Sequence, residues 1–157
     1  MEIKGVLHED FVNYKKPSML VMFPKCDFKC DRECGSPMCQ NSKLAQGPTT
    51  CISAAALADY YINNDFTSAI VCAGLEPFDT PVELVELVHQ IRLKTDDDIV
   101  IYTGYNEDEI TVWVYQLSLY KNIYIKFGRF IPNCKPHYDE VLGVNLASDN
   151  QYGKKVS

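Results

Sequence analysis

Cysteines are the residues of this sequence with the clearest capacity for chemistry. Seven are present, and four of them, Cys26, Cys30, Cys34 and Cys39, form the pattern C-x3-C-x3-C-x4-C. Thiolates are soft ligands that select zinc, copper(I) or iron–sulfur clusters. The number of cysteines is odd and no secretion signal is present, so we expect a metal or catalytic role rather than a disulfide framework.

The spacing of the cysteines distinguishes between kinds of metal site. Zinc held by four thiolates usually has two close pairs separated by a dozen or more residues, whereas only three residues separate Cys30 from Cys34. Four thiolates saturate the cluster of an electron-transfer ferredoxin. Three thiolates would leave one iron open to a substrate, as the free position does in a catalytic zinc site. The residues alone leave open whether three or four cysteines bind.

The composition is that of one globular domain. The chain has 157 residues, of which 46% are hydrophobic and 23% are charged. Its net charge of −6 argues against nucleic-acid binding, because contacts to phosphates need clustered Lys and Arg. No apolar run is long enough for a membrane span, and charged residues near the start interrupt any secretory segment. We therefore expect a cytoplasmic protein without membrane contact.

Apolar runs alternate with helical patterns along the chain. Residues 18–24, 68–72, 98–103 and 123–127 are expected to form buried strands, with a last strand over 141–147 before a polar tail. Helices are expected over about 50–62, 81–91 and 106–120, the second with a Thr80–Glu83 capping box. This alternation predicts one α/β domain over residues 1–157 with a largely parallel sheet. Residues 25–48 lack periodicity and are expected to be a long cluster-binding loop.

The carboxyl ends of the predicted strands carry the other unusual residues. Parallel sheets bind ligands at this edge, so the ends should form one rim. Cys51 and Cys72 fall in a predicted helix and a predicted buried strand, and we expect both to be core thiols. The segments expected at the rim are Pro24–Cys39, Gly74–Pro77, Thr103–Tyr105 and Gly128–Phe130.

An ordered set of motifs resembles the radical S-adenosylmethionine (SAM) activating enzymes, most closely the activases of anaerobic ribonucleoside-triphosphate reductases. Cys26 and Cys30 match the C-x3-C of that family, and Tyr102–Tyr105 matches its Y-T-G-Y. Four further segments resemble its D-x-V-N, C-Y-N-x-S, G-G-E-P and G-S-S-N-Q motifs: Asp10–Asn13, Cys39–Ser42, Gly74–Pro77 and Ala147–Gln151. The resemblance covers nearly the whole chain, in order.

The resemblance implies a partial (β/α) barrel of the radical SAM type, a 4Fe–4S cluster held by three cysteines, and SAM at the open iron. It implies Cys26 and Cys30 as ligands, with Cys39 preferred and Cys34 as the alternative third ligand. The preference rests on the residue before the third cysteine, which lies near the SAM adenine in the family. Met38 is apolar, whereas Glu33 before Cys34 would bury a carboxylate there.

By the same resemblance, SAM would be bound by Met38, Gln40 and the segment Gly74, Leu75, Glu76 and Pro77. Gly74 would let the backbone approach SAM, and Glu76 would contact its amino group. Leu75 departs from the family's second glycine.

The implied activity is hydrogen abstraction from a backbone glycine of a large glycyl-radical enzyme, with anaerobic ribonucleotide reductase as the suspected partner. Flavodoxin or ferredoxin would supply the electron. Two alternatives remain: a radical SAM enzyme acting on a small molecule, such as a short relative of the deazaguanine synthases, and a non-catalytic iron–sulfur or zinc binding module. No catalytic side chain is identified.

Overall fold

Four parallel strands form the centre of the sheet. The computed structural model describes residues 1–157 and places β3 (Ser18–Phe23), β5 (Ala69–Gly74), β6 (Asp98–Tyr102) and β7 (Ile123–Phe127) side by side in chain order. The antiparallel edge strands are β2 (Gly5–Asp10), beside β3, and β10 (Tyr152–Lys155), beside β7. The predicted mixed α/β domain with a largely parallel sheet is therefore confirmed.

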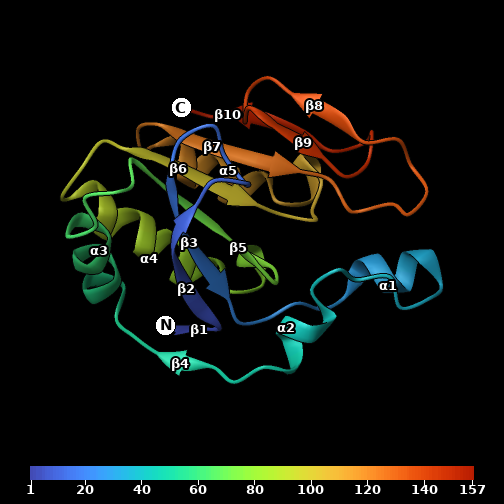
Figure 1. Cartoon of the computed structure of the whole chain (residues 1–157), viewed down its shortest axis with the longest axis horizontal. Coiled ribbons are helices and arrows are strands. Elements are labelled where there is room, and N and C mark those ends of the chain that lie inside the picture. Colours follow the sequence, from blue (N-terminus) through green and yellow to red (C-terminus); the bar gives the residue numbers. More distant parts are fainter.

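Helices join the parallel strands and pack on one face of the sheet. These are α3 (Ala54–Ile62), α4 (Pro81–Arg92) and α5 (Thr111–Ser118), the last two preceded by the short 3₁₀ turns η1 (Pro77–Asp79) and η2 (Glu107–Glu109) (Figure 1). Alternate strand residues such as Ile70 and Cys72 point into this helical core. Cys72 is fully buried, as predicted for a core thiol.

The opposite face of the sheet has a smaller core. Ala69 and Val71 alternate with the residues of the helical face and contact Tyr14, Leu142 and Leu146. The last of these residues belongs to a hairpin of β8 (His137–Asp139) and β9 (Val144–Leu146), which lies apart from the helices in Figure 1. Burial on both faces explains why the central strands are nearly continuous apolar runs.

Several local expectations were wrong. The polar tail contains strand β10, because its backbone pairs with β7 and needs no apolar side chains. Thr50–Cys51 is strand β4, paired with β1 (Glu2–Ile3), so Cys51 is exposed and the helix begins at Ala54. The side chain of Thr80 makes no capping hydrogen bond.

The segment after β3 leaves the sheet at its carboxyl edge. It is less irregular than expected, since it forms α1 (Lys29–Cys34) and α2 (Ser42–Gln46), which lie beyond the tips of the parallel strands in Figure 1. Gly35 ends α1 in the left-handed conformation, with φ of 68°. No helix in the structure has both the length and the apolar character needed to cross a membrane.

Candidate metal centre

The carboxyl ends of the strands meet around the side chain of Glu76. Its carboxylate accepts hydrogen bonds from the Thr103 hydroxyl (2.8 Å), the Gly104 N–H (2.8 Å) and the Phe78 N–H (3.1 Å). The backbone N–H of Glu76 donates to the carbonyl oxygen of Lys25 at 2.7 Å. The ends of β3, β5 and β6 are thus tied into the single rim that the sequence predicts.

Two cysteine sulfurs at this rim accept a hydrogen bond from a backbone N–H group. Phe28 donates to Cys26 Sγ at 3.3 Å and Asn41 donates to Cys39 Sγ at 3.4 Å. At Cys30, burial raises the pKa of the thiol, and the backbone N–H of Phe130 opposes that shift. Hydrogen bonds to cysteine sulfurs are typical of iron–sulfur sites, where they tune the reduction potential.

Burial disfavours the thiolate forms of Cys26 and Cys30 in the absence of a cation. Desolvation raises the pKa of Cys26 to about 12, and it also raises the pKa of Cys30. The Coulombic influence of Cys39 adds to both upward shifts, after burial. A bound metal centre would supply the missing positive charge, so this donor set fits an iron–sulfur cluster.

Cys34 is placed differently from the other three cysteines. It lies at the end of α1 and is exposed, whereas Cys26, Cys30 and Cys39 are half-buried. It lines a cavity of about 330 Å³ together with Cys30, Glu33, Arg129 and Asn150. Cys134 is half-buried in the loop after β7, and nothing at the rim involves it.

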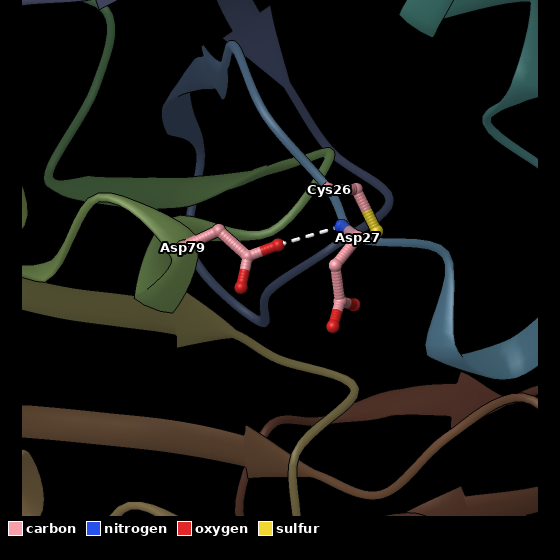
Figure 2. Close-up of side chains that lie close together, drawn as sticks. All are labelled: Cys26, Asp27 and Asp79. Atoms are coloured by element: carbon pink, nitrogen blue, oxygen red, sulfur yellow. Dashed lines mark hydrogen bonds between the residues drawn. The ribbon is translucent and has the colours of Figure 1, made fainter.

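Cys26 also lies beside two carboxylates, as Figure 2 shows. Its sulfur and one oxygen each of Asp27 and Asp79 fall within 4.8 Å of one another. The carboxylate of Asp79 accepts from the Asp27 N–H at 2.8 Å and from the Tyr105 hydroxyl at 2.7 Å. The carboxylate of Asp27 accepts from the N–H of Lys29 and from the side chain of Arg32. These carboxylates are already engaged within the protein, so they support the loop that carries Cys26.

A cavity of about 530 Å³ opens next to Cys26. Leu75 and Ala45 line it, so one expected SAM-binding residue faces this space. Met38 is half-buried beside Cys39, and Gln40 is exposed with no hydrogen bond to the rest of the chain. Pro77 begins η1 and is buried.

Gly74 lies where β5 and β3 approach each other closely. Its φ is 94°, and a Cβ atom there would lie 2.9 Å from Met22 Cα and 3.0 Å from Met22 Cβ. The missing side chain therefore allows β5 to approach β3, and it does not leave space for a ligand. The Gly74 carbonyl oxygen accepts a hydrogen bond from Asn41 Nδ2 at 2.7 Å, which ties the cysteine loop to β5.

Glu76 also differs from its expected role at the SAM amino group. Its side chain is buried and all its bonds are internal. Desolvation raises its pKa to about 7, although the donors from Gly104, Thr103 and Phe78 oppose that shift. The residue therefore joins the strand ends rather than presenting a carboxylate to a ligand.

The space between these groups is kept open by Gly104. A Cβ atom built there would lie 3.6 Å from Glu76 Oε2, 3.8 Å from Arg129 Cγ and 3.8 Å from Cys30 Sγ. Its hydrogen atoms therefore face the Cys30 sulfur. Tyr105 beside it donates its hydroxyl to Asp79, and its ring lies 3.7 Å from Lys29 Nζ.

Two cations lie at the end of β7. Burial lowers the pKa of Lys126 to about 8, and its ammonium donates to the carbonyl oxygens of Gly128 and Thr103 at 2.7 and 3.4 Å. Arg129 forms a bidentate pair with Glu109 at 2.6 and 2.7 Å, and that pair raises the pKa of Arg129. Its Nε lies 3.1 Å from Glu33 on α1.

The Ala147–Gln151 segment supports the same end of β7. Asn150 Nδ2 donates to the carbonyl oxygen of Arg129 at 2.8 Å, and Gln151 Nε2 donates to that of Gly128 at 3.3 Å. This motif therefore positions the backbone that leads to Phe130. Asp10, in contrast, pairs with Ser18 at the amino end of β3, away from the rim.

Sequence reasoning missed Asp31, Asp79 and Arg129. Asp31 Oδ1 accepts from the N–H groups of Met38 and Cys39, both at 2.8 Å. Asp79 comes shortly after the Gly74–Pro77 segment, and Arg129 comes shortly after β7. Their positions after strand ends were the features of the sequence that could have identified them as residues of the site.

Comparison with known proteins gives one match. A family model described as a 4Fe-4S single cluster domain matches residues 18–143, which include all the candidate cysteines and the four parallel strands. No curated protein and no solved structure shows a match.

Proposed function

The chain belongs to the 4Fe-4S single cluster domain family, an iron–sulfur family of the radical SAM type, and from that premise we propose that it is a radical SAM oxidoreductase that activates a partner enzyme. The observation that carries the proposal is the set of three half-buried cysteines, Cys26, Cys30 and Cys39, at the carboxyl edge of a parallel sheet, with a cavity open beside Cys26. The sequential order of β3, β5, β6 and β7 supports a partial barrel.

When bound, a 4Fe–4S cluster supplies the electron for reductive cleavage of SAM to methionine and a 5′-deoxyadenosyl radical. The residues of the chain hold and shield this chemistry. Cys26, Cys30 and Cys39 hold the cluster, and their N–H donors stabilise the charge on the sulfurs. Gly104 leaves space beside Cys30. The Glu76 hydrogen bonds keep the strand ends fixed, so that the site is preorganised before SAM arrives.

The cavity beside Cys26 is the proposed SAM site. Its volume of about 530 Å³ is within the range of small-molecule pockets, and Leu75 provides an apolar wall. Met38, the residue before Cys39, is half-buried but does not line this cavity. Because the Glu76 carboxylate is turned inward, the amino group of SAM would meet backbone carbonyl oxygens of the Gly74–Pro77 segment instead.

The proposed substrate is a glycine-bearing loop of a partner protein, with anaerobic ribonucleotide reductase as the suspected partner. A radical must be kept from water, and the small domain leaves the rim open, so a docked loop would complete the enclosure. The −6 charge favours a partner with a basic face, whose association would weaken with salt. Flavodoxin or ferredoxin is the proposed electron donor, and the setting is cytoplasmic.

Cleavage of SAM by the reduced protein tests the enzyme assignment. The protein is reconstituted with iron and sulfide without oxygen, reduced, and incubated with SAM, and 5′-deoxyadenosine is measured. We expect a brown protein that forms 5′-deoxyadenosine and loses this capacity in Cys26→Ala. A colourless zinc protein, or a brown protein that leaves SAM intact, would overturn the assignment in favour of a binding module.

A glycyl-radical signal tests the partner. The reduced protein, SAM and a reductase encoded nearby are mixed without oxygen, and an EPR doublet that collapses on deuteration of the partner's glycines is expected. Formation of 5′-deoxyadenosine driven by a small molecule, with no doublet, would favour the small-molecule enzyme.

A further inference from the structure

The segment between the second and third proposed ligands is long, and it must be folded back before Cys39 can reach Cys30. Eight residues, 31–38, separate the two cysteines. A flexible segment of this length samples many conformations, and closing it has an entropic cost. The fold must therefore contain a contact that selects the returned conformation.

Asp31 makes that contact. One oxygen of its carboxylate accepts hydrogen bonds from two successive backbone N–H groups, those of Met38 and Cys39, both at 2.8 Å. Asp31 follows Cys30 directly and lies in the first turn of α1, so its side chain links the second cysteine to the third. Bonds from N–H groups to a carboxylate are stronger than bonds between neutral groups.

The backbone around this contact supports the same path. Gly35 ends α1 with φ of 68°, in the left-handed region. No atom lies within 4 Å of a Cβ built there, so glycine is favoured at this turn by its backbone conformation and not by lack of space. After Cys39, the N–H of Asn41 bonds to the Cys39 sulfur and its side chain bonds to the Gly74 carbonyl oxygen. Cys39 is thus held through its backbone N–H by Asp31 and through its sulfur by Asn41, whereas Cys34 is left exposed on α1.

We infer that Asp31 is a positioning residue that selects Cys39, and not Cys34, as the third cluster ligand by holding residues 31–38 in a closed loop. This inference rests on the proposed function for the identity of the bound group. The closed loop itself exists in the protein without a cluster, and it can therefore be measured separately.

The first experiment uses the apo protein. Cysteine alkylation by N-ethylmaleimide is followed residue by residue with mass spectrometry in wild type, Asp31→Ala, Asp31→Asn and Ser36→Ala. Ser36 is exposed in the same segment and makes no hydrogen bond, so it provides the matched control. Loss of two charge-assisted bonds should speed alkylation of Cys39 by at least about tenfold in Asp31→Ala, with Cys34 unchanged. Asp31→Asn keeps an acceptor oxygen and should restore most of the protection.

The second experiment measures cluster retention. After reconstitution, loss of iron to a chelator should be at least about tenfold faster in Asp31→Ala than in wild type or Ser36→Ala, with Asp31→Asn between them. Unchanged circular dichroism would exclude general unfolding. In the wild-type background, Cys39→Ala should lose the cluster and Cys34→Ala should keep it.

Equal alkylation of Cys39 in Asp31→Ala and wild type would overturn the inference, as would a cluster that needs Cys34 and tolerates Cys39→Ala. A wild-type protein that takes up no iron and sulfide would instead refute the proposed function, and the alkylation result would still decide whether Asp31 closes the loop.

Discussion

Replacing Gly104 with alanine is expected to stabilise the empty protein while weakening its hold on a cluster. The added Cβ would lie at ordinary contact distances of 3.6–3.8 Å from its neighbours, and the backbone of Gly104 lies outside the left-handed region. Alanine therefore fits, and it reduces the entropy of the unfolded chain. The free energy of unfolding should rise by about 0.4–1 kcal/mol, which corresponds to a melting temperature higher by about 1–4 °C.

The same methyl group occupies space beside the Cys30 sulfur. Overpacking a filled site costs about 1–3 kcal/mol, so affinity for the cluster should fall by about 5- to 150-fold, and further in Gly104→Val. The assay pairs thermal unfolding of the apo protein with iron and sulfide content after matched reconstitution. The two readouts should move in opposite directions.

Gly74→Ala is the control for this pair of measurements. Its φ is 94° and its Cβ would lie 2.9 Å from Met22 Cα, so this variant should lower the stability of the empty protein by about 2–5 kcal/mol. If Gly104→Ala also destabilises the apo protein, or if Gly104→Val binds a cluster as wild type does, then Gly104 does not keep space for the cluster.

Three other predictions concern the groups that hold the rim. Glu76→Ala removes the acceptor of three hydrogen bonds and should lower the free energy of unfolding by about 3–5 kcal/mol in chemical denaturation; a loss below about 1 kcal/mol would contradict its linking role. The folded pKa of Glu76, about 7, exceeds its ordinary 4.5, so the folded apo protein binds the proton more tightly. The free energy of unfolding of the apo protein should therefore fall by at most about 3 kcal/mol as pH rises from 4.5 to 7. Chemical denaturation of Glu76→Gln should not show this pH-dependent fall. Asn41→Ala should speed cluster loss several-fold with little change in melting temperature, because it frees the cysteine loop from β5; equal retention would show that this bond is dispensable.

The four parallel strands could be predicted because each is a short apolar run with a Gly or Pro at its end or within two residues after it. Their residues are buried on both faces, and hydrophobicity reports that burial directly. Strand β10 could not be predicted in this way, since Tyr152–Lys155 pairs through its backbone at an edge where polar side chains are tolerated.

The site was predictable only in its outline. The cysteines and the Gly74–Pro77 segment could be identified from their types and spacing, and the structure brings their ends together. Which direction a side chain takes is set by tertiary packing. The inward turn of Glu76 and the contact of the Gly74 position with Met22 therefore required the structure. Asp31 was missed because its carboxylate accepts hydrogen bonds from N–H groups seven and eight residues later in the chain. Neither a helical nor a strand pattern indicates a contact at that spacing.

The late position of Phe130, which lines one cavity with Cys30, has a consequence for how the protein is made. Phe130 lies about a hundred residues after Cys30, and the Ala147–Gln151 segment that supports it comes later still. At about 5–20 residues per second, translation exposes the cysteines for about 5–20 s before their enclosing segment leaves the ribosome. Throughout that interval the nascent chain presents reduced thiols to oxygen and to stray metal ions. We therefore expect assembly of an iron–sulfur cluster to follow the synthesis and folding of the Ala147–Gln151 segment.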